Sequence, residues 1–278
     1  MKRCIQSVVC TFIFLGLVVT AGAYVLPAKQ VLDFMVEQFG SNQTLVVFQK
    51  TVVYDPDIEG GMEELDETLY YMYPDRFRSE VSGPELEKIQ VLNEEGALVV
   101  IDGKIFGETE SLFDHFKDLL LYSRIDLLVD KVSQLGVNVD IVSLGRFRDK
   151  VVYVVGAKYP DESVSQVWID KKNFRPVRFI LNGRKETPIR EIEYSEYREL
   201  DKTKVYPGRI SFYEDGNLVR MYVLERFEIN PEISDQMFDV GYLKGIYEPT
   251  DSTDPSTLPD SELDEVRRSL EEFKKIFE

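Results

Sequence analysis

The sequence predicts an α+β protein of mainly antiparallel β-structure, with a few helices on one face of the sheet. Short runs rich in β-branched and aromatic residues, separated by Gly, Pro, Asp and Asn, fill most of residues 44–101 and 137–229. Apolar residues at helical spacing occur before the first of these regions, between the two, and again near the end of the chain. This order, with helices set apart from strands, indicates an antiparallel sheet with a few helices on one face.

The first 23 residues have the pattern of a secretory signal peptide. Lys2 and Arg3 precede the apolar run CIQSVVCTFIFLGLVV, and Ala21-Gly22-Ala23 matches a small-x-small cleavage site. The alternative is a retained transmembrane anchor. It is less favoured because the apolar run is shorter than the ~20 residues that a membrane span needs.

Cysteine content and charge limit the chemistry of the exported chain. Both cysteines, Cys4 and Cys10, lie within the predicted signal, so the mature protein is expected to have no disulfide and no thiolate. The formal net charge of −17 becomes −19 once Lys2 and Arg3 are removed. Such an acidic chain is not expected to bind nucleic acid, because phosphate contacts depend on lysine and arginine. An anionic membrane surface would repel it for the same reason.

The sequence also predicts three helices that would cover one face of the sheet. The first spans residues 27–39, whose apolar side chains share one face and are followed by Gly40. The other two lie between the strand regions, where Ser111–Asp114 and Ser123–Asp126 each match the S-x-x-acid pattern of an N-terminal cap. Bulky apolar residues follow each cap at helical spacing.

The second strand region predicts both a hairpin and a doubly covered sheet. Glu214-Asp215-Gly216-Asn217 is a strong turn signal, since Asp-Gly tolerates the positive φ of tight hairpins. The strand VVYVV at 151–155 is apolar on both faces. A sheet of this kind needs a cover on each side. Either it curls on itself, or its concave face encloses an apolar cavity beneath the helices.

The composition changes after Phe238. We therefore expect one domain over residues 24–240, an acidic linker rich in Pro, Ser and Thr over 241–260, and an amphipathic helix over 261–278. The last helix would dock on the domain or contact a partner.

No residue pattern indicates catalysis or metal binding. The chain has one histidine, His115, between Phe113 and Phe116 in a predicted helix, where packing is favoured over catalysis. No G-x-S-x-G sequence is present, and one histidine without cysteines is a poor zinc-ligand set. The sequence therefore predicts a protein that is no enzyme, with no catalytic residues, no cofactor and no metal.

Four stretches carry a resemblance to a known family. In order they are LYYMYPDRFRSE (69–80), LVVIDGKIF (98–106), VWIDKKNFRPVRFIL (167–181) and FEINPEISDQMFDV (227–240). They resemble the strand-proline-strand unit, the V-x-D-G-K hairpin, the W-I-D…P hairpin and the closing strand of the LolA/LolB-like periplasmic lipoprotein carriers. The resemblance covers residues 27–240. In the soluble carrier an arginine precedes the proline of the first stretch and helps to hold the lid shut, whereas Tyr73 stands here.

The resemblance implies a half-barrel, that is, an incomplete and strongly curved β-barrel of about ten or eleven strands with a lid of about three helices. It also implies that acyl chains are held between the sheet and the lid. The chain would then be a periplasmic, monomeric carrier or chaperone for an acylated lipoprotein or lipid, acting in outer-membrane lipoprotein sorting or lipid transport. Inner- and outer-membrane transport proteins would be its partners. Such a site requires vacant apolar space, and an interior filled by the protein's own side chains would count against it. The cavity and lid residues expected are Val31, Met35, Phe39, Phe116, Leu119, Leu128, Trp168 and Phe179.

Two other functions stay open. In one, the same fold is an envelope sensor or scaffold, and the acidic tail contacts a partner protein. In the other, the protein hydrolyses a lipid or glycan with His115 in the active site.

Overall fold

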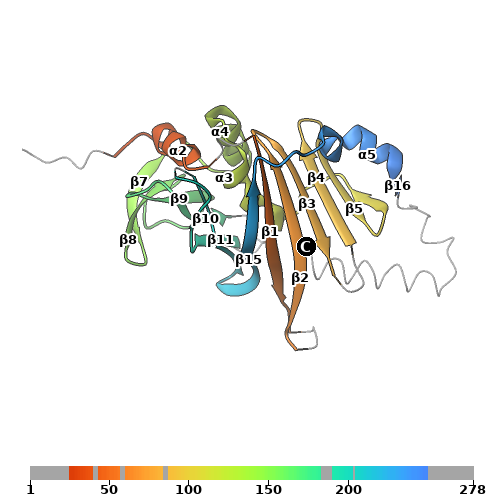
Figure 1. Ribbon diagram of the computed structural model, residues 1–278. Coiled ribbons are helices and arrows are strands. Elements are labelled where there is room, and N and C mark those ends of the chain that lie inside the picture. Colours follow the sequence, from red (N-terminus) through yellow and green to blue (C-terminus); the bar gives the residue numbers. More distant parts are fainter. Residues whose placement is uncertain are drawn as a thin grey trace, which may run out of the picture.

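The computed structural model describes residues 25–39, 43–56, 60–83, 87–182, 190–202 and 204–249. The predicted signal peptide (1–23) and the predicted C-terminal helix (261–278) lie outside the described residues. Most of the described chain forms a single large sheet that is strongly curved and open (Figure 1). No helix in these ranges has the length and apolar character needed to span a membrane.

Two runs of strands build the sheet. The first contains β1 (Thr44–Tyr54), β2 (Met62–Met72), β3 (Arg76–Ser82), β4 (Glu87–Asn93), β5 (Gly96–Ile101) and β6 (Lys104–Gly107). The second contains β7 (Val142–Phe147), β8 (Lys150–Val155), β9 (Gln166–Asp170), β10 (Pro176–Leu181), β11 (Arg190–Ser195), β14 (Arg209–Glu214) and β15 (Asn217–Ile229). The short strands β12 (Arg198–Glu199) and β13 (Val205–Tyr206) form a separate pair, and β16 (Glu248–Pro249) joins β6 in parallel.

Within the described ranges the sheet has 14 strands, in the order β16-β6-β5-β4-β3-β2-β1-β15-β14-β11-β10-β9-β8-β7. The predicted α+β class and the curved, mainly antiparallel sheet are confirmed. The expected number of about ten or eleven strands is too low. The sheet also stays open, because its edge strands β16 and β7 do not pair with each other.

Alternation of side chains gives the sheet two different faces. In the pairing of β1 with β2, Leu45 lies opposite Tyr71 and Val47 opposite Leu69, and all four side chains belong to the main core on the concave face. Met72, the residue after Tyr71, packs on the other face of the sheet. A shift of one residue would exchange the two sets, so burial of the concave face fixes the register.

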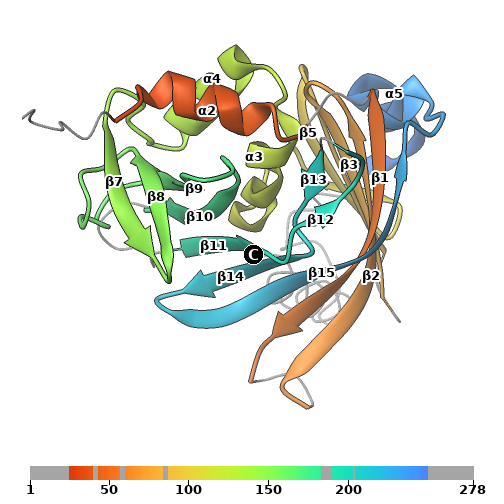
Figure 2. The same ribbon diagram turned by 60° about the vertical axis from the view of Figure 1, so that its left-hand side comes forward.

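The lid helices cover the concave face as predicted (Figure 2). They are α2 (Ala28–Val36), the 3₁₀ helix η1 (Leu112–Lys117) with α3 (Asp118–Leu121), and α4 (Ile125–Gln134). At the start of η1 the Asp114 carboxylate accepts a hydrogen bond from the Ser111 amide at 2.6 Å, which is one half of a capping box. The predicted cap at Ser123 is wrong, because Arg124 is the residue that precedes α4.

The opposite face has a cover of its own. The 3₁₀ helix η2 (Asp235–Phe238) and α5 (Val240–Ile246) pack Phe238, Val240 and Leu243 against the outer side chains of β4 and β5. The predicted linker at 241–260 is therefore wrong for its first residues, which form α5 and then β16. The Asp239 carboxylate caps α5 by accepting a hydrogen bond from the Tyr242 amide at 2.8 Å.

The predicted hairpin at 214–217 is confirmed. Glu214 pairs with Asn217 across the turn between β14 and β15. Asp215 and Gly216 have φ values of 47° and 81°, which is the left-handed region that an Asp-Gly turn requires.

Candidate functional site

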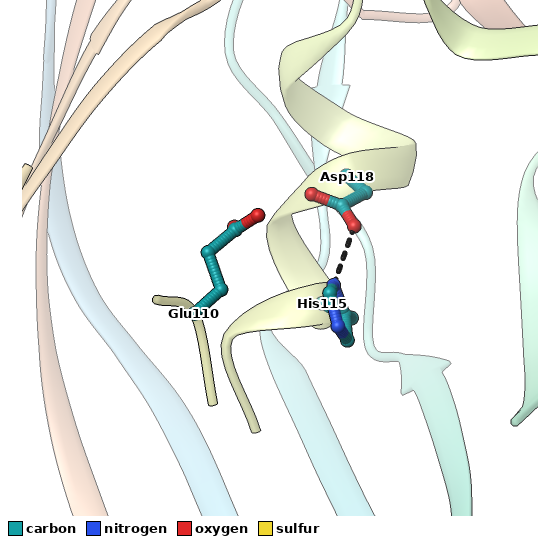
Figure 3. A group of neighbouring side chains, drawn as sticks. All are labelled: Glu110, His115 and Asp118. Carbon is teal, nitrogen blue, oxygen red and sulfur yellow. Dashed lines mark hydrogen bonds and ion pairs between the residues drawn. The ribbon is translucent and has the colours of Figure 1, made fainter. Parts of the chain in front are cut away.

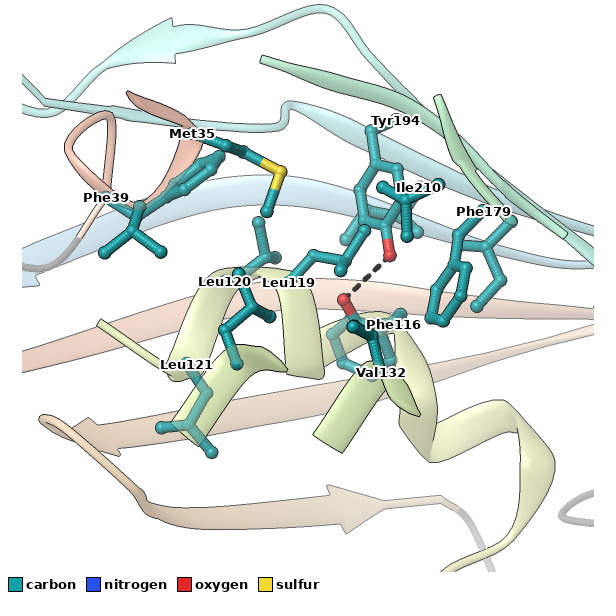
Figure 4. Close-up of a cluster of buried hydrophobic side chains, with 14 of the residues drawn as sticks. Met35, Phe39, Phe116, Leu119, Leu120, Leu121, Val132, Phe179, Tyr194 and Ile210 are labelled. Carbon is teal, nitrogen blue, oxygen red and sulfur yellow. Dashed lines mark hydrogen bonds between the residues drawn. The ribbon is translucent and has the colours of Figure 1, made fainter. Parts of the chain in front are cut away.

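The space between the lid and the concave face is an apolar interior (Figure 4). We call this cluster the lid-side core; it joins residues of all the lid helices to residues of both runs of strands. Seven of the eight residues expected to line a cavity lie in it, and none of the seven is more than 3% exposed. They are Val31, Met35, Phe39, Phe116, Leu119, Leu128 and Phe179.

Trp168 lies elsewhere, and its prediction as a cavity residue is wrong. Its neighbours Val167 and Ile169 enter the lid-side core, so the indole is on the outer face of β9. There the Arg178 guanidinium lies 4.6 Å from the ring centroid, and Nε1 donates to Gln166 at 2.9 Å. Every residue from 166 to 170 is buried, so the sequence pattern does not separate the two faces.

The lid-side core is filled by the protein's own side chains. The two best-defined hollows in the described part of the protein lie away from the lid: one is lined by residues of 147–150, 173–177 and 194–197, the other by residues of 74–76, 93–95 and Arg124. Under the lid, the ring of Phe116 packs with its centroid 4.7 Å from that of Tyr222 and 6.1 Å from that of Phe212. The residues expected to line a cavity thus pack against one another in this closed conformation.

One hydrogen bond fastens the lid directly to the sheet. The hydroxyl of Tyr194 in β11 donates to the backbone oxygen of Phe116 in η1 at 3.0 Å, in buried surroundings. Tyr73, at the position of the family's arginine, packs against the lid-side core, with its ring stacked 6.0 Å from Tyr71. Burial raises the pKa of Tyr73. A neutral aromatic ring therefore occupies the position where the resemblance leads one to expect a cation.

A buried group of charges joins the lid helices to one another, and we call it the lid charge cluster. It comprises Glu110, His115, Lys117, Asp118 and Lys131. Figure 3 shows Glu110, His115 and Asp118. Glu110, in the loop after β6, accepts hydrogen bonds from Lys117 and from Lys131, the latter at 2.5 Å. The Asp118 carboxylate lies 3.3 Å from the Lys117 ammonium nitrogen and 2.9 Å from His115 Nδ1. The cluster thus ties η1 and α3 to α4.

The same cluster offers an arrangement that a metal could use. One ligand atom each from Glu110, His115 and Asp118 lies within 4.8 Å of the others. However, the ammonium groups of Lys117 and Lys131 already contact these carboxylates and supply the positive charge that a cation would bring. His115 is only 7% exposed, and neither hollow reaches it. The arrangement is therefore that of a structural ion network in which the histidine packs and donates or accepts one hydrogen bond.

Acid is expected to weaken this network through Glu110. Burial alone would raise the pKa of this carboxyl, but the ammonium groups of Lys117 and Lys131 outweigh burial and lower the pKa to about 2 from its ordinary 4.5. A depressed pKa contributes stability above about pH 4.5, and that stability is lost as the pH falls towards 2. In urea denaturation over this range, the free energy of unfolding of Glu110→Gln should fall less steeply than that of the unmodified protein. Parallel curves would contradict this.

The fold is shared with known structures of low sequence identity. A domain from Vibrio parahaemolyticus described as an outer membrane lipoprotein-sorting protein matches with a TM-score of 0.54 at 9% identity, over 77% of this chain and 97% of its own. A LolA superfamily protein from Nitrosomonas europaea matches with a TM-score of 0.55 at 12% identity, over 78% of this chain and 100% of its own. A DUF1329 family protein from Desulfovibrio piger matches with a TM-score of 0.52 at 12% identity, over 79% and 100%.

Sequence comparisons give no further relative. No family model matches the chain, and no curated protein matches it. The predicted resemblance to LolA-like proteins is confirmed at the level of the fold.

Proposed function

We propose that this chain is a periplasmic, non-enzymatic binding protein that holds the acyl chains of a lipoprotein or lipid between the concave face and the lid. One observation carries the proposal: amphipathic helices close over the apolar concave face of an open curved sheet, in a fold shared with LolA superfamily structures. The lid charge cluster ties η1 and α3 to α4, so that these helices are held to one another by charge as well as by packing.

The filled interior requires the lid to move when a ligand binds. An acyl chain gains ~0.8 kcal/mol for each CH₂ group removed from water. In the closed protein Met35, Leu119 and their neighbours already occupy that environment. A ligand therefore exchanges one hydrocarbon contact for another. Such an exchange has a small net free energy, which suits a carrier that must both take up and release its cargo.

Detergent-free purification tests the proposal directly. Organic extracts of the full mature protein, analysed by mass spectrometry, should contain a stoichiometric acylated species. A fluorescent fatty acid or a synthetic lipopeptide should also bind the delipidated protein saturably. Absence of any co-purifying acyl species, together with no saturable binding of either probe, would refute the proposal.

Removal of the hydrogen bond between sheet and lid is expected to favour the open state. Tyr194→Phe removes the hydroxyl that donates to the backbone oxygen of Phe116. The closed state should then be less stable by about 1 kcal/mol. If opening limits binding, the apparent affinity for the fatty acid should rise about fivefold. Titration of the fluorescent probe measures this.

A matched control exists in the same sheet. Tyr70→Phe also removes a tyrosine hydroxyl that donates a hydrogen bond, here to the Glu80 carboxylate at 3.3 Å, but Tyr70 packs on the outer face of the sheet and lines neither hollow. Its affinity for the probe should equal that of the unmodified protein. Equal affinities in both variants would show that the Tyr194 bond does not restrain the lid.

A further inference from the structure

The hollow at the curled end of the sheet has the features of an anion site. It is built by the turn between β7 and β8, the loop between β9 and β10, and the chain that leaves β11, which lie together at one end of these strands (Figure 2). Its volume is about 440 Å³, within the range typical of ligand pockets. Three cations face it in a protein whose net charge is −17: Arg148, Lys150 and Arg175.

Arg175 is held in place but has no counter-ion. Its backbone oxygen accepts from the Asp170 amide at 2.9 Å, and its amide donates to Asn173 Oδ1 at 3.1 Å, so the loop is fixed. The guanidinium lies 5.3 Å from the ring centroid of Tyr197, and its Nε is buried without a hydrogen-bond partner. Among the described residues it forms no ion pair.

The other charges of the hollow are largely neutralised by protein partners. Arg148 contacts Glu193 at 2.5 Å, and Lys150 contacts Asp170 at 3.3 Å. Of the two acidic residues in the lining, Glu196 contacts Arg209 at 3.1 Å, while Asp149 lies exposed in the turn. Of the three cations that line the hollow, Arg175 is thus the one for which the described residues supply no anion. A planar guanidinium suits a carboxylate or a phosphate.

We infer that this hollow binds the carboxylate or phosphate group of an amphiphilic ligand, with Arg175 as the anion-binding residue. The inference rests on the proposed function, because it gives a place to the polar end of an acylated molecule. A water molecule occupies about 30 Å³, so the hollow has room for much more than a bare phosphate. It also adjoins the lid-side core: Tyr194 lines the hollow, while its hydroxyl bonds to Phe116 of the lid. An anionic head group here and an acyl chain in the interior would lie on either side of Tyr194.

Binding of three probes to the full mature protein tests the inference: octyl phosphate, octanol and inorganic phosphate, each measured by calorimetry. Arg175→Met keeps the apolar stem that lies against Tyr197 and removes the charge. It should weaken octyl phosphate binding about tenfold or more and leave octanol binding unchanged. Arg175→Lys keeps the charge without the planar fork and should give an intermediate loss. The control is Arg226→Met, which removes another arginine stacked on a ring, that of Phe48, far along the chain from the hollow. It should bind all three probes like the unmodified protein.

Each outcome separates the inference from the function it rests on. Equal octyl phosphate affinity in the unmodified protein and in Arg175→Met, with thermal unfolding unchanged, overturns the anion site and leaves acyl binding untouched. Inorganic phosphate binding as tightly as octyl phosphate, with the same dependence on Arg175, overturns the assignment to an amphiphile and identifies a free anion as the ligand. If the unmodified protein binds neither octanol nor the fatty acid, the proposed acyl function itself is refuted.

Discussion

Replacing Lys117 with methionine is expected to lower the free energy of unfolding by about 3–5 kcal/mol. The Lys117 ammonium is fully buried, and it contacts both Glu110 and Asp118. Burial lowers the pKa of this lysine, but the neighbouring carboxylates outweigh burial and raise it, so the side chain stays charged. Without it, Asp118 keeps only His115 and a distant Lys131, 3.8 Å away. A buried carboxylate that has lost its main partner is strongly destabilising. Urea denaturation at neutral pH measures the loss.

The matched control is an exposed lysine that also contacts two acidic residues. Lys50 lies 2.7 Å from Asp66 and 3.4 Å from Glu64, with its side chain 29% exposed. Because water screens such pairs, Lys50→Met should leave the free energy of unfolding nearly unchanged. A Lys117→Met variant as stable as the unmodified protein would show that the free energy of desolvating these charges cancels the free energy of their attraction. The lid helices would then be held together by apolar contacts alone.

Periodicity predicts the helices and the antiparallel strands, while the lid and the strong curvature of the sheet are implied by the resemblance. The helix at 27–39 repeats its apolar residues at i, i+3 and i+4, and these residues, Val31 and Met35 among them, are the ones that the structure buries. The cap signal at Ser111 also places η1 correctly, because the reciprocal bond from Asp114 is local in sequence. The signal at Ser123 has the same pattern but fails, because α4 begins one residue later than the pattern predicts and the Asp126 carboxylate contacts Arg124.

The features that the sequence did not predict depend on contacts between distant residues. Nothing near Leu243 indicates that the outer side of β4 and β5 will bury it, so the sequence predicts a linker from residue 241. The side of β9 on which Trp168 lies depends on how the whole sheet is covered, since β9 is buried on both faces. The lid charge cluster did leave a signal. Lys117 falls between Phe116 and Leu119 in a predicted apolar helix, and a lysine in such a place needs a buried carboxylate.

Shortening Leu119 to alanine should create the vacant apolar space that the closed protein lacks. Leu119 is 1% exposed in the lid-side core, so Leu119→Ala is expected to cost about 2–5 kcal/mol of stability. If acyl chains enter this interior, a saturating fatty acid fills the new space and binds the folded state more tightly. Ligand binding to the folded state raises its stability with the logarithm of the affinity. The fatty acid should therefore stabilise Leu119→Ala by about 1 kcal/mol more than it stabilises the unmodified protein, as measured by thermal unfolding with and without ligand.

Ile180→Ala separates a binding interior from an ordinary core. Ile180 is as deeply buried, at 0% exposed, but lies with Trp168 on the outer face of the sheet, away from the lid. Its loss of stability should be similar, because the same kind of cavity is created. The fatty acid should restore none of it beyond what the unmodified protein gains. Equal rescue of both variants would mean that the ligand fills any apolar hole, and rescue of neither would make the lid-side core purely structural. Rescue of Leu119→Ala alone requires a path for acyl chains beneath the lid, because only an opening lid connects that cavity with the solvent.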